Sequence, residues 1–181
     1  MSENQQNPWI EGLQTIGLSI VLALGIRQFV AEARFIPSES MVPTLQIDDR
    51  LVIEKISYRF NPPKRGDIIV FQAPAKALAA VDKPNSHDAY IKRVIGLPGD
   101  TVEVKDNKVF IDGTALEENY IQAPPTYTWG PDTVPEGQYL VLGDNRNSSS
   151  DGHIWGFLPQ ETIIGRAVVR FWPPSRIGGL D

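Results

Sequence analysis

The strongest constraint on this chain is an uncharged apolar run near its N-terminus, at residues 12–26 (GLQTIGLSIVLALGI). At ~1.5 Å per residue, a helix of this length spans roughly 22 Å, which is shorter than the ~30 Å hydrocarbon core of a bilayer. The span lengthens if Glu11 and Arg27 lie at opposite interfaces and the flanking aromatic residues act as interfacial anchors. The run therefore predicts a single-pass membrane helix over about residues 9–30.

Two other interpretations of this segment stay open. The shortness of the run favours a buried amphipathic helix, and Ala31-Glu32-Ala33 matches the small-x-small site at which a cleavable signal peptide ends. No Lys or Arg precedes the run, whereas a signal peptide begins with a positively charged region. The positive charges after the helix would by themselves keep the following domain in the cytoplasm, but long domains often translocate regardless of charge.

The composition excludes several kinds of function. The 181 residues carry a formal net charge of −5 and no block of Lys or Arg, so the chain lacks the basic surface of a nucleic-acid binder. Cys is absent, which excludes disulfides, cysteine-ligated zinc and a cysteine nucleophile. With only His87 and His153, a three-histidine metal site cannot form. The length fits one domain with a short appendage, and 15 Gly and 15 Pro indicate many turns.

The chain after the apolar run has the pattern of short β-strands. Runs rich in Val and Ile, bounded by Pro and Gly, predict strands at residues 50–56, 67–72, 90–97, 138–142 and 163–172. Residues 101–104 and 108–111 alternate across Asp106-Asn107, which predicts a hairpin. Two stretches rich in Pro and Ala, 73–86 and 123–137, are interpreted as excursions from the sheet. The predicted fold is mostly β: a membrane helix within residues 1–33, then one mostly antiparallel β domain at residues 34–181.

Three polar segments contain residue types that can carry chemistry. Residues 36–45 (IPSESMVPTL) hold two serines on a turn stiffened by prolines, although a helix-to-strand connection with capping serines fits equally. Residues 90–100 (YIKRVIGLPGD) place Lys92 in a Val/Ile strand, either as an edge-strand gatekeeper or as a buried amine with a depressed pKa. Residues 143–153 (GDNRNSSSDGH) form a polar loop after a strong strand, where both functional sites and surface turns occur.

Together and in this order, the three segments resemble the sequence boxes of bacterial type I signal peptidases (leader peptidases), in particular the small single-anchor forms of cyanobacteria and thylakoids. PSESMVPTL, YIKRVIGLPGD and GDNRNSSSD followed by WG carry the resemblance, which runs from about Trp9 to Trp172. It implies a coiled antiparallel β-sheet catalytic domain of the signal peptidase and LexA-like type. It also implies a membrane-bound serine endopeptidase that removes N-terminal signal peptides from exported preproteins after Ala-x-Ala sites.

The resemblance also implies roles for individual residues. Ser40, directly before Met41, matches the nucleophile, and Lys92 matches its general base. Ser38 matches a hydroxyl that completes the oxyanion hole together with the backbone N–H of Ser40. Ser149 matches a serine that hydrogen-bonds the lysine. The other matches are residues that brace the site by ion pairing (Asp144, Asp151, Arg93) and residues that line pockets for small substrate side chains (Ile36, Leu45, Ile91).

One part of the third box departs from the family pattern. Many members have Asp-Ser-Arg or Asp-Ser-His where this chain has Asp151-Gly152-His153. Gly152 removes a hydroxyl, and His153 is a weaker ion-pair partner than an arginine because it is charged only when protonated. This departure bears on the role of Asp151.

A Ser–Lys pair suits the implied reaction. A serine hydroxyl needs a base to take its proton, and a lysine with its reference pKa near 10.4 is protonated at pH 7. Burial can lower that pKa by about three units at a cost of ~4 kcal/mol. The mechanism needs no metal and no cofactor. The expected partners are signal peptides and the lipid bilayer, with no nucleic acid, and the expected location is a bacterial cell membrane or a thylakoid membrane, with the domain on the trans (periplasmic or lumenal) side.

Three other functions fit parts of the sequence. A Ser–His–Asp hydrolase would use His153 or His87, but the chain has no G-x-S-x-G elbow. An autoproteolytic repressor-type protease shares the Ser–Lys chemistry, but it needs a DNA-binding helix-turn-helix in place of an apolar anchor. A membrane-anchored β domain without activity predicts that Ser40→Ala changes nothing catalytic.

Overall fold

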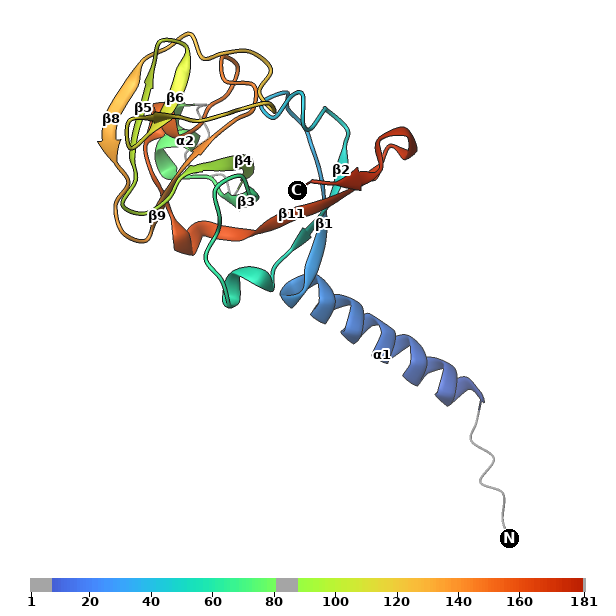
Figure 1. Cartoon of the computed structure of the whole chain (residues 1–181). Helices are drawn as coiled ribbons and strands as arrows, with labels where there is room; N and C mark the ends of the chain where they lie inside the picture. Colours follow the sequence, from blue (N-terminus) through green and yellow to red (C-terminus); the bar gives the residue numbers. More distant parts are fainter. Residues whose placement is uncertain (1–7, 81–87, 181) are drawn as a thin grey trace.

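The computed structural model describes residues 8–80 and 88–180. Its first element, α1 (Pro8–Phe29), projects away from the rest of the molecule (Figure 1). Within the described residues, Trp9–Phe29 is long and apolar enough to cross a membrane, and none of it is buried against the domain. At ~1.5 Å per residue it spans about 32 Å, which matches the hydrocarbon core. The predicted helix at residues 9–30 is therefore confirmed, and its exposure contradicts the alternative of a buried amphipathic helix.

The domain that follows is built on an eight-stranded antiparallel sheet. The strand order is β1-β2-β11-β3-β4-β9-β10, and β12 pairs with β11. The strands are β1 (Ala31–Phe35), β2 (Arg50–Glu54), β3 (Ile68–Gln72), β4 (Ala89–Gly96), β9 (Gln138–Leu142), β10 (Leu158–Pro159), β11 (Ile163–Trp172) and β12 (Gly178–Gly179). β11 pairs with β2 on one side and with β3 on the other, with register shifts along both. All five runs predicted as strands in this sheet are strands.

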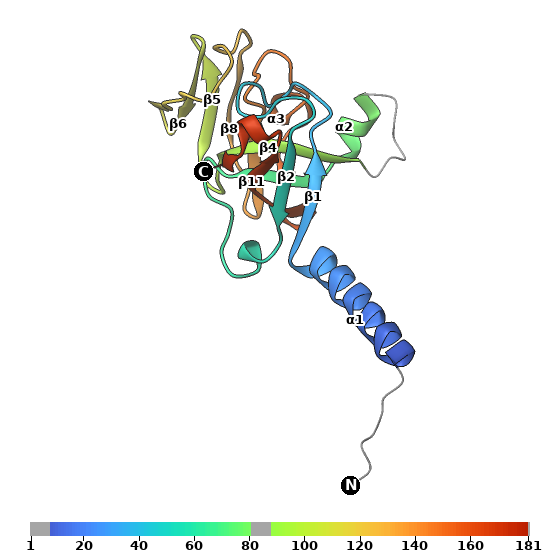
Figure 2. The same cartoon turned by 90° about the vertical axis from the view of Figure 1, so that its right-hand side faces the viewer.

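A smaller sheet of four strands has the order β7-β6-β5-β8. Its strands are β5 (Thr101–Lys105), β6 (Lys108–Ile111), β7 (Thr114–Ala115) and β8 (Trp129–Thr133). It lies at the end of the molecule remote from α1 (Figures 1 and 2). Asp106 and Asn107 have φ values of 49° and 61° between β5 and β6. A two-residue turn with both φ values positive matches strand twist, so the predicted hairpin is confirmed.

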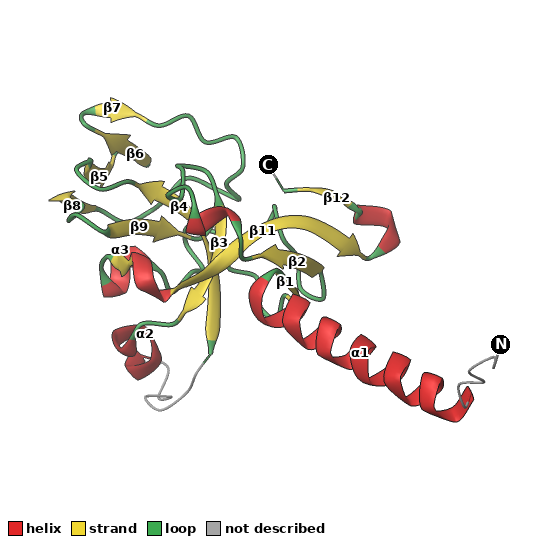
Figure 3. Ribbon diagram, turned by 90° about the horizontal axis from the view of Figure 1, so that it is seen from below, coloured by secondary structure: helices red, strands yellow, loops and turns green. Residues whose placement is uncertain are grey.

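Several elements were not predicted from the sequence, and β1, β8 and α2 are the longest of them. β1 has the sequence AEARF, which lacks an apolar alternation, but it pairs in antiparallel register with β2. The two stretches interpreted as excursions contain β8 and a short helix, α2 (Ala75–Ala80). α2 lies beside α3 (Gly152–Trp155) (Figure 3), where Ala77 and Trp155 share a buried apolar cluster. These elements form through contacts with distant strands, which a local pattern does not contain.

One apolar cluster holds the loop between β1 and β2, residues 36–49, against the large sheet. Met41 and Leu45, from the middle of this loop, are fully buried members of the cluster. Burying a side chain of this size contributes about 1.5–3 kcal/mol. The other buried members are Ile36, Leu51, Ile53, Ile68, Val70, Ile91, Ala167 and Leu180.

Candidate active site

Ser40 lies in the loop between β1 and β2, and this loop is closed at its base. The backbone N–H of Ile36 donates to the carbonyl of Asp49 at 2.9 Å. Further along, the N–H of Leu45 donates to the carbonyl of Met41 at 2.8 Å, so the chain turns back on itself. Because Ser40 directly precedes the buried Met41, the anchored side chain fixes its position. The Ser40 residue is only 7% exposed.

Lys92 comes from the middle of β4, where it lies opposite Ile69 of β3. Its Nζ donates to Ser40 Oγ at 2.8 Å and to the carbonyl oxygen of Ile91 at 2.9 Å. The residue is 4% exposed, so it is not an edge-strand gatekeeper. The fold thus joins a hydroxyl and an amine that are far apart in the sequence.

Burial lowers the pKa of Lys92 from 10.5 to about 8, because the ammonium loses its hydration. The nearby carboxylates of Asp151 and Asp144 act in the opposite direction, since they stabilise the charged form. With a pKa of about 8, about one-tenth of the lysine is neutral at pH 7, compared with well under one-thousandth at the ordinary value. The amine therefore has a usable neutral fraction at physiological pH.

Ser38 adds a second hydroxyl to this pair. Its Oγ lies 3.3 Å from Ser40 Oγ, and the residue is exposed on the surface from which Ser40 is approached. The two hydroxyls and the amine therefore form one cluster.

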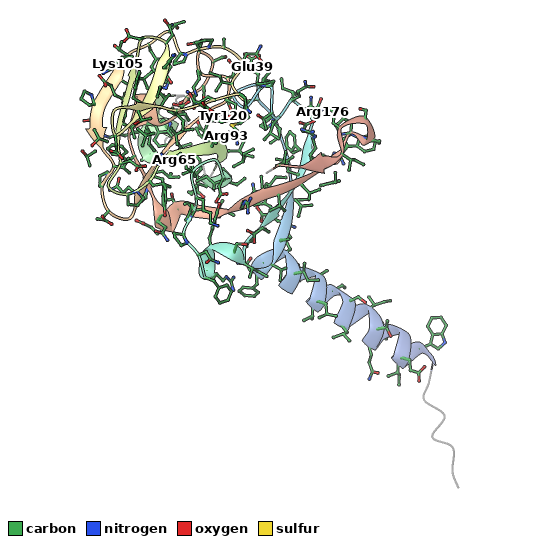
Figure 4. All side chains as sticks on the ribbon, viewed as in Figure 1. Glu39, Arg65, Arg93, Lys105, Tyr120 and Arg176 are labelled. Carbon is green, nitrogen blue, oxygen red and sulfur yellow. The ribbon has the colours of Figure 1, made fainter. Side chains whose placement is uncertain are left out.

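Arg93 and Asp144 form a bidentate ion pair next to this cluster. Arg93 Nε donates to Asp144 Oδ1 at 2.8 Å, and Nη2 donates to Oδ2 at 2.7 Å. Thr44 Oγ1 also donates to Asp144 Oδ2, at 2.5 Å, which ties the Ser40 loop to this pair. The Arg93 guanidinium stacks over the ring of Tyr120 at 4.1 Å (Figure 4). Two-pronged pairing fixes orientation as well as distance, so β4, the Ser40 loop and the loop after β9 are held together.

Asp151 is fully buried and has a histidine as its ionisable partner. Its Oδ2 accepts the backbone N–H of Gly143 at 2.8 Å, and its Oδ1 lies 2.7 Å from His153 Nδ1. It also caps α3 by accepting the backbone N–H of His153. Gly152 has no room for a side chain, because a Cβ there would lie 2.7 Å from Leu140 Cδ1. Both departures from the family pattern thus have a local structural basis.

The hydrogen bond predicted between Ser149 and Lys92 is absent from the structure. The Ser149 hydroxyl is buried and has no hydrogen-bond partner among the described residues. Instead it lies against Gly143, where a Cβ would collide with both Ser149 Oγ and the carbonyl oxygen of Ser40. The lysine donates to Ser40 and to the carbonyl of Ile91. Ser149 therefore neighbours the Ser40 main chain rather than the amine.

A groove of about 770 Å³ leads to Ser40 and Lys92. One wall is the end of β1 and the following loop, and the other is the start of β4. β9 pairs with β4 only from Arg93 onward, so no strand of the described residues pairs with that edge of β4 at residues 89–92. β1 is the first strand of the sheet and also has one such edge. Because β1 and β4 share a groove although β2, β11 and β3 separate them in the sheet, the sheet is coiled, as predicted.

Two of the three predicted lining residues face this groove. Ile36 and Ile91 line it, whereas Leu45 is fully buried in the same apolar cluster and does not. The turn after Met41 explains the difference, since it directs Leu45 into the core. Tyr90 lines the groove as well, which the sequence analysis did not single out.

A buried ion pair behind the site, Arg146–Glu118, was not predicted from the sequence. Arg146, whose side chain is inaccessible, donates from Nη1 to Glu118 Oε2 at 2.8 Å and from Nε to the carbonyl of Gly143 at 3.2 Å. An arginine within a loop of Asn and Ser was a usable signal. Its partner lies 28 residues earlier in a loop without a recognisable pattern.

The histidines and acidic residues do not gather into a metal site. Across residues 8–80 and 88–180, no three His, Asp or Glu side chains lie close enough together to hold an ion. His87 lies outside the described residues. The candidate site contains a serine and a lysine joined by a hydrogen bond, an arrangement that Ser–Lys hydrolases use.

Comparisons with known proteins agree with this class. A family model described as signal peptidase, peptidase S26, matches residues 9–172. The chain is 64% identical to signal peptidase I of Leptolyngbya laminosa, over 96% of this chain and 85% of that protein. It is 44% identical to thylakoidal processing peptidase 1 of Arabidopsis thaliana, over 88% of this chain and 47% of that protein. A solved signal peptidase I structure from Enterococcus faecalis, 34% identical, covers 59% of this chain and 97% of its own, with a TM-score of 0.45.

The chain belongs to the signal peptidase family, peptidase S26. The family model begins and ends at the two residues, Trp9 and Trp172, between which the sequence resemblance runs. The predictions of this family and of an enzyme are confirmed.

Proposed function

We propose that this chain is a membrane-anchored peptidase that removes N-terminal signal peptides from exported preproteins after Ala-x-Ala sites. Ser40 is the nucleophile and Lys92 is the general base. The observation that carries this proposal is the 2.8 Å hydrogen bond between their side chains next to the groove. Membership of the signal peptidase family supports the choice of reaction.

The chemistry follows from the two side chains. Neutral Lys92 takes the Ser40 proton while Oγ attacks the scissile carbonyl, and the resulting ammonium returns that proton to the leaving amine. The backbone N–H of Ser40 and the hydroxyl of Ser38 donate to the oxyanion. Lys92 then deprotonates a water that hydrolyses the acyl-enzyme. Every step uses groups of the chain itself.

The groove accounts for the class of substrate. An extended peptide can add to the unpaired edge at residues 89–92 and lie alongside β1, because main-chain hydrogen bonds accept any sequence. Ile36 and Ile91 line the groove, and we expect these two side chains to limit the positions beside the scissile bond to small side chains. The unpaired strand edge and the restricted space beside the scissile bond together select an extended segment with Ala at alternate positions.

Neighbouring polar residues hold this geometry. The Arg93–Asp144 pair fixes β4 to the Ser40 loop through Thr44. Asp151 fixes the backbone of Gly143, next to the carbonyl of Ser40.

The helix α1 is the membrane anchor. Ser40 follows its last residue, Phe29, by eleven residues, so the groove stays close to the bilayer surface. Confinement of enzyme and preprotein to one membrane raises their effective concentration. We place the domain on the trans side of a bacterial cell membrane or a thylakoid membrane. Residues 1–33 form the anchor segment and residues 34–181 the peptidase domain, to which β1 contributes from Ala31 onward.

The test is cleavage of a preprotein with an Ala-x-Ala site by the full chain in detergent. Ser40→Ala and Lys92→Ala should each abolish processing, whereas the matched controls Ser57→Ala and Lys105→Ala should not. N-terminal sequencing of the product should place the cut after the second Ala. Processing by Ser40→Ala at the wild-type rate would contradict the role of Ser40 as nucleophile, and no processing by the wild type would leave only a non-catalytic domain.

The side of the membrane can be tested separately, because the chain has no native Cys. A single Lys105→Cys variant should react with an impermeant maleimide added to the trans side of sealed vesicles. Labelling only from the cytoplasmic side would contradict the proposed topology.

A second candidate, a Ser–His–Asp hydrolase, is favoured by the 2.7 Å contact between His153 and Asp151. Such an enzyme would lose activity in His153→Ala and keep it in Lys92→Ala. No hydrogen bond joins His153 to Ser40 in the part of the chain that the structure describes, whereas Lys92 makes one.

A further inference from the structure

The ring of His153 is held at the edge of the site by two contacts. Its Nδ1 lies 2.7 Å from Oδ1 of the fully buried Asp151. Its face stacks on the ring of Tyr127, with centroids 4.0 Å apart and an angle of 13° between the planes. The side chain is 18% exposed, so water can exchange protons with the ring.

Asp151 connects this ring to the main chain of the nucleophile. Its second oxygen accepts the N–H of Gly143, and Gly143 is packed so closely against the carbonyl of Ser40 that a Cβ would collide with it. The N–H of Asn145 donates to that same Ser40 carbonyl at 3.1 Å. Two contacts therefore connect the His153–Asp151 pair to the main chain of Ser40: Asp151 with Gly143, and Gly143 with the Ser40 carbonyl.

Asp151 also acts on the base. Its negative charge favours the ammonium form of Lys92, in opposition to the effect of burial. A neutral imidazole leaves the charge of Asp151 uncompensated, whereas an imidazolium compensates it. Histidine is the side chain that ordinarily changes charge between about pH 5 and pH 8. The strength with which Asp151 holds the lysine proton therefore depends on His153.

Among the described residues, the other charged groups around this pair are paired or exposed. Tyr127 stays neutral, because burial raises its pKa far above the ordinary value. On α2, which packs beside α3, the charged residue is Lys76, and it is exposed. Among the described residues, the buried charges near Asp151 and Lys92 form two ion pairs, Arg93–Asp144 and Arg146–Glu118, and the other charged residues that line the groove are exposed.

We propose that His153 is a positioning residue whose protonation, transmitted through Asp151, makes Lys92 release its proton more readily. The enzyme then loses less activity below neutral pH than a lysine base alone would allow. This inference rests on the proposed roles of Ser40 and Lys92. An arginine at this position would hold the site permanently in the compensated state, and the histidine makes that state depend on pH.

The experiment is the pH profile of kcat/KM for the full chain in detergent, on a fluorogenic peptide with an Ala-x-Ala site. His153→Asn keeps a hydrogen-bond donor to Asp151 but carries no charge, and His153→Arg is charged at every pH. The Asn variant should match the wild type above pH 8 and fall about threefold to tenfold below it near pH 5–6. The acid limb of the Arg variant should move to lower pH by about half to one unit.

Coincident acid limbs in all three proteins would overturn the inference. A uniform loss in the Asn variant at every pH would overturn it as well, because that is the mark of a purely structural role. If the Arg variant does not fold, the Asn variant decides the question. Lys92→Ala is measured in parallel. Activity in that variant would contradict the proposed function itself. If Lys92→Ala is inactive and the acid limbs of the other proteins coincide, only the role of His153 is contradicted.

Discussion

Replacing Lys92 by Met should make the domain more stable at neutral pH while abolishing activity. The pKa of this lysine falls from 10.5 to about 8 on folding. A difference of about 2.5 units, at 1.36 kcal/mol per unit, corresponds to about 3 kcal/mol of stability that the charged amine removes. Met fills a similar volume without a charge, so the variant avoids this penalty.

The sign of the effect follows from proton binding. Between pH 8 and pH 10.5 the unfolded chain holds the Lys92 proton and the folded chain does not. Stability of the wild type therefore rises with pH in that interval, and the full penalty of about 3 kcal/mol applies below it. The variant also leaves the carbonyl of Ile91 without its donor, which costs about 1–2 kcal/mol at every pH. The variant should therefore have the higher free energy of unfolding below pH 8, and the wild type should have the higher one above pH 10.5.

The assay is urea unfolding of both full chains in detergent, followed by near-UV circular dichroism of the buried Trp155. Subtracting the unfolding free energy of one protein from that of the other removes the contribution of all other titrating groups, because these groups are the same in both proteins. Lys105→Met is the matched control, because that lysine side chain is 46% exposed and should show no such dependence on pH. A difference that stays constant from pH 7 to pH 11 would refute the reasoning, since it would mean that Lys92 titrates alike in both states.

Three further predictions concern other variants of the chain. Ser38→Ala should fold normally and lose about 2–4 kcal/mol of transition-state stabilisation in kcat, the range for one oxyanion donor. Asp49→Asn should lower the free energy of unfolding by about 3 kcal/mol in urea, because the buried carboxylate that faces Arg176 at 3.0 Å and Arg170 at 3.6 Å is removed. The wild-type rate should rise with pH until it levels near pH 8, whereas Lys92→Arg should be inactive throughout, since a guanidinium does not deprotonate.

Local patterns predicted the elements whose structure depends on local forces. The apolar helix, the Val/Ile strands and the turn at Asp106-Asn107 all follow from side-chain type and backbone preference. β1 does not, because its strand conformation comes from main-chain pairing with β2 rather than from its own side chains. Leu45 shows the same limit: an apolar residue near the nucleophile suits a pocket or a core equally, and the turn at Met41 decides between them.

The site was predictable in its chemistry and less so in its contacts. Ser40 and Lys92 carry a recognisable pattern, and their hydrogen bond depends only on the coiling that brings β4 next to the β1 loop. The partner of Asp151 and the environment of Ser149 depend on rotamers and on the space around Gly143. Sequence spacing does not report such distances, so the bracing contacts had to be observed.

The Ala31-Glu32-Ala33 segment should be cut slowly after Ala33 by a second copy of the enzyme. It matches the small-x-small pattern, but it lies in β1, paired with β2. Glu32 is also held by ion pairs to Arg34 and Lys55, both at 2.6 Å. The strand must therefore open before it can enter a groove. Only seven residues separate Ala33 from Ser40, about 25 Å at full extension, which is too short to turn the chain back into its own groove.

The product should begin at Arg34, keep both Ser40 and Lys92, and lose the anchor, so it should be soluble and poorer on membrane-bound substrates. Lys55→Ala removes one of the ion pairs that hold β1 and should speed the cut, while cleavage should rise with enzyme concentration because two molecules are needed. Mass spectrometry of aged wild-type and Ser40→Ala samples decides the question. Equal cleavage in both proteins would identify another protease as the cause, and an intact chain in both after long incubation at high concentration would mean that β1 does not open.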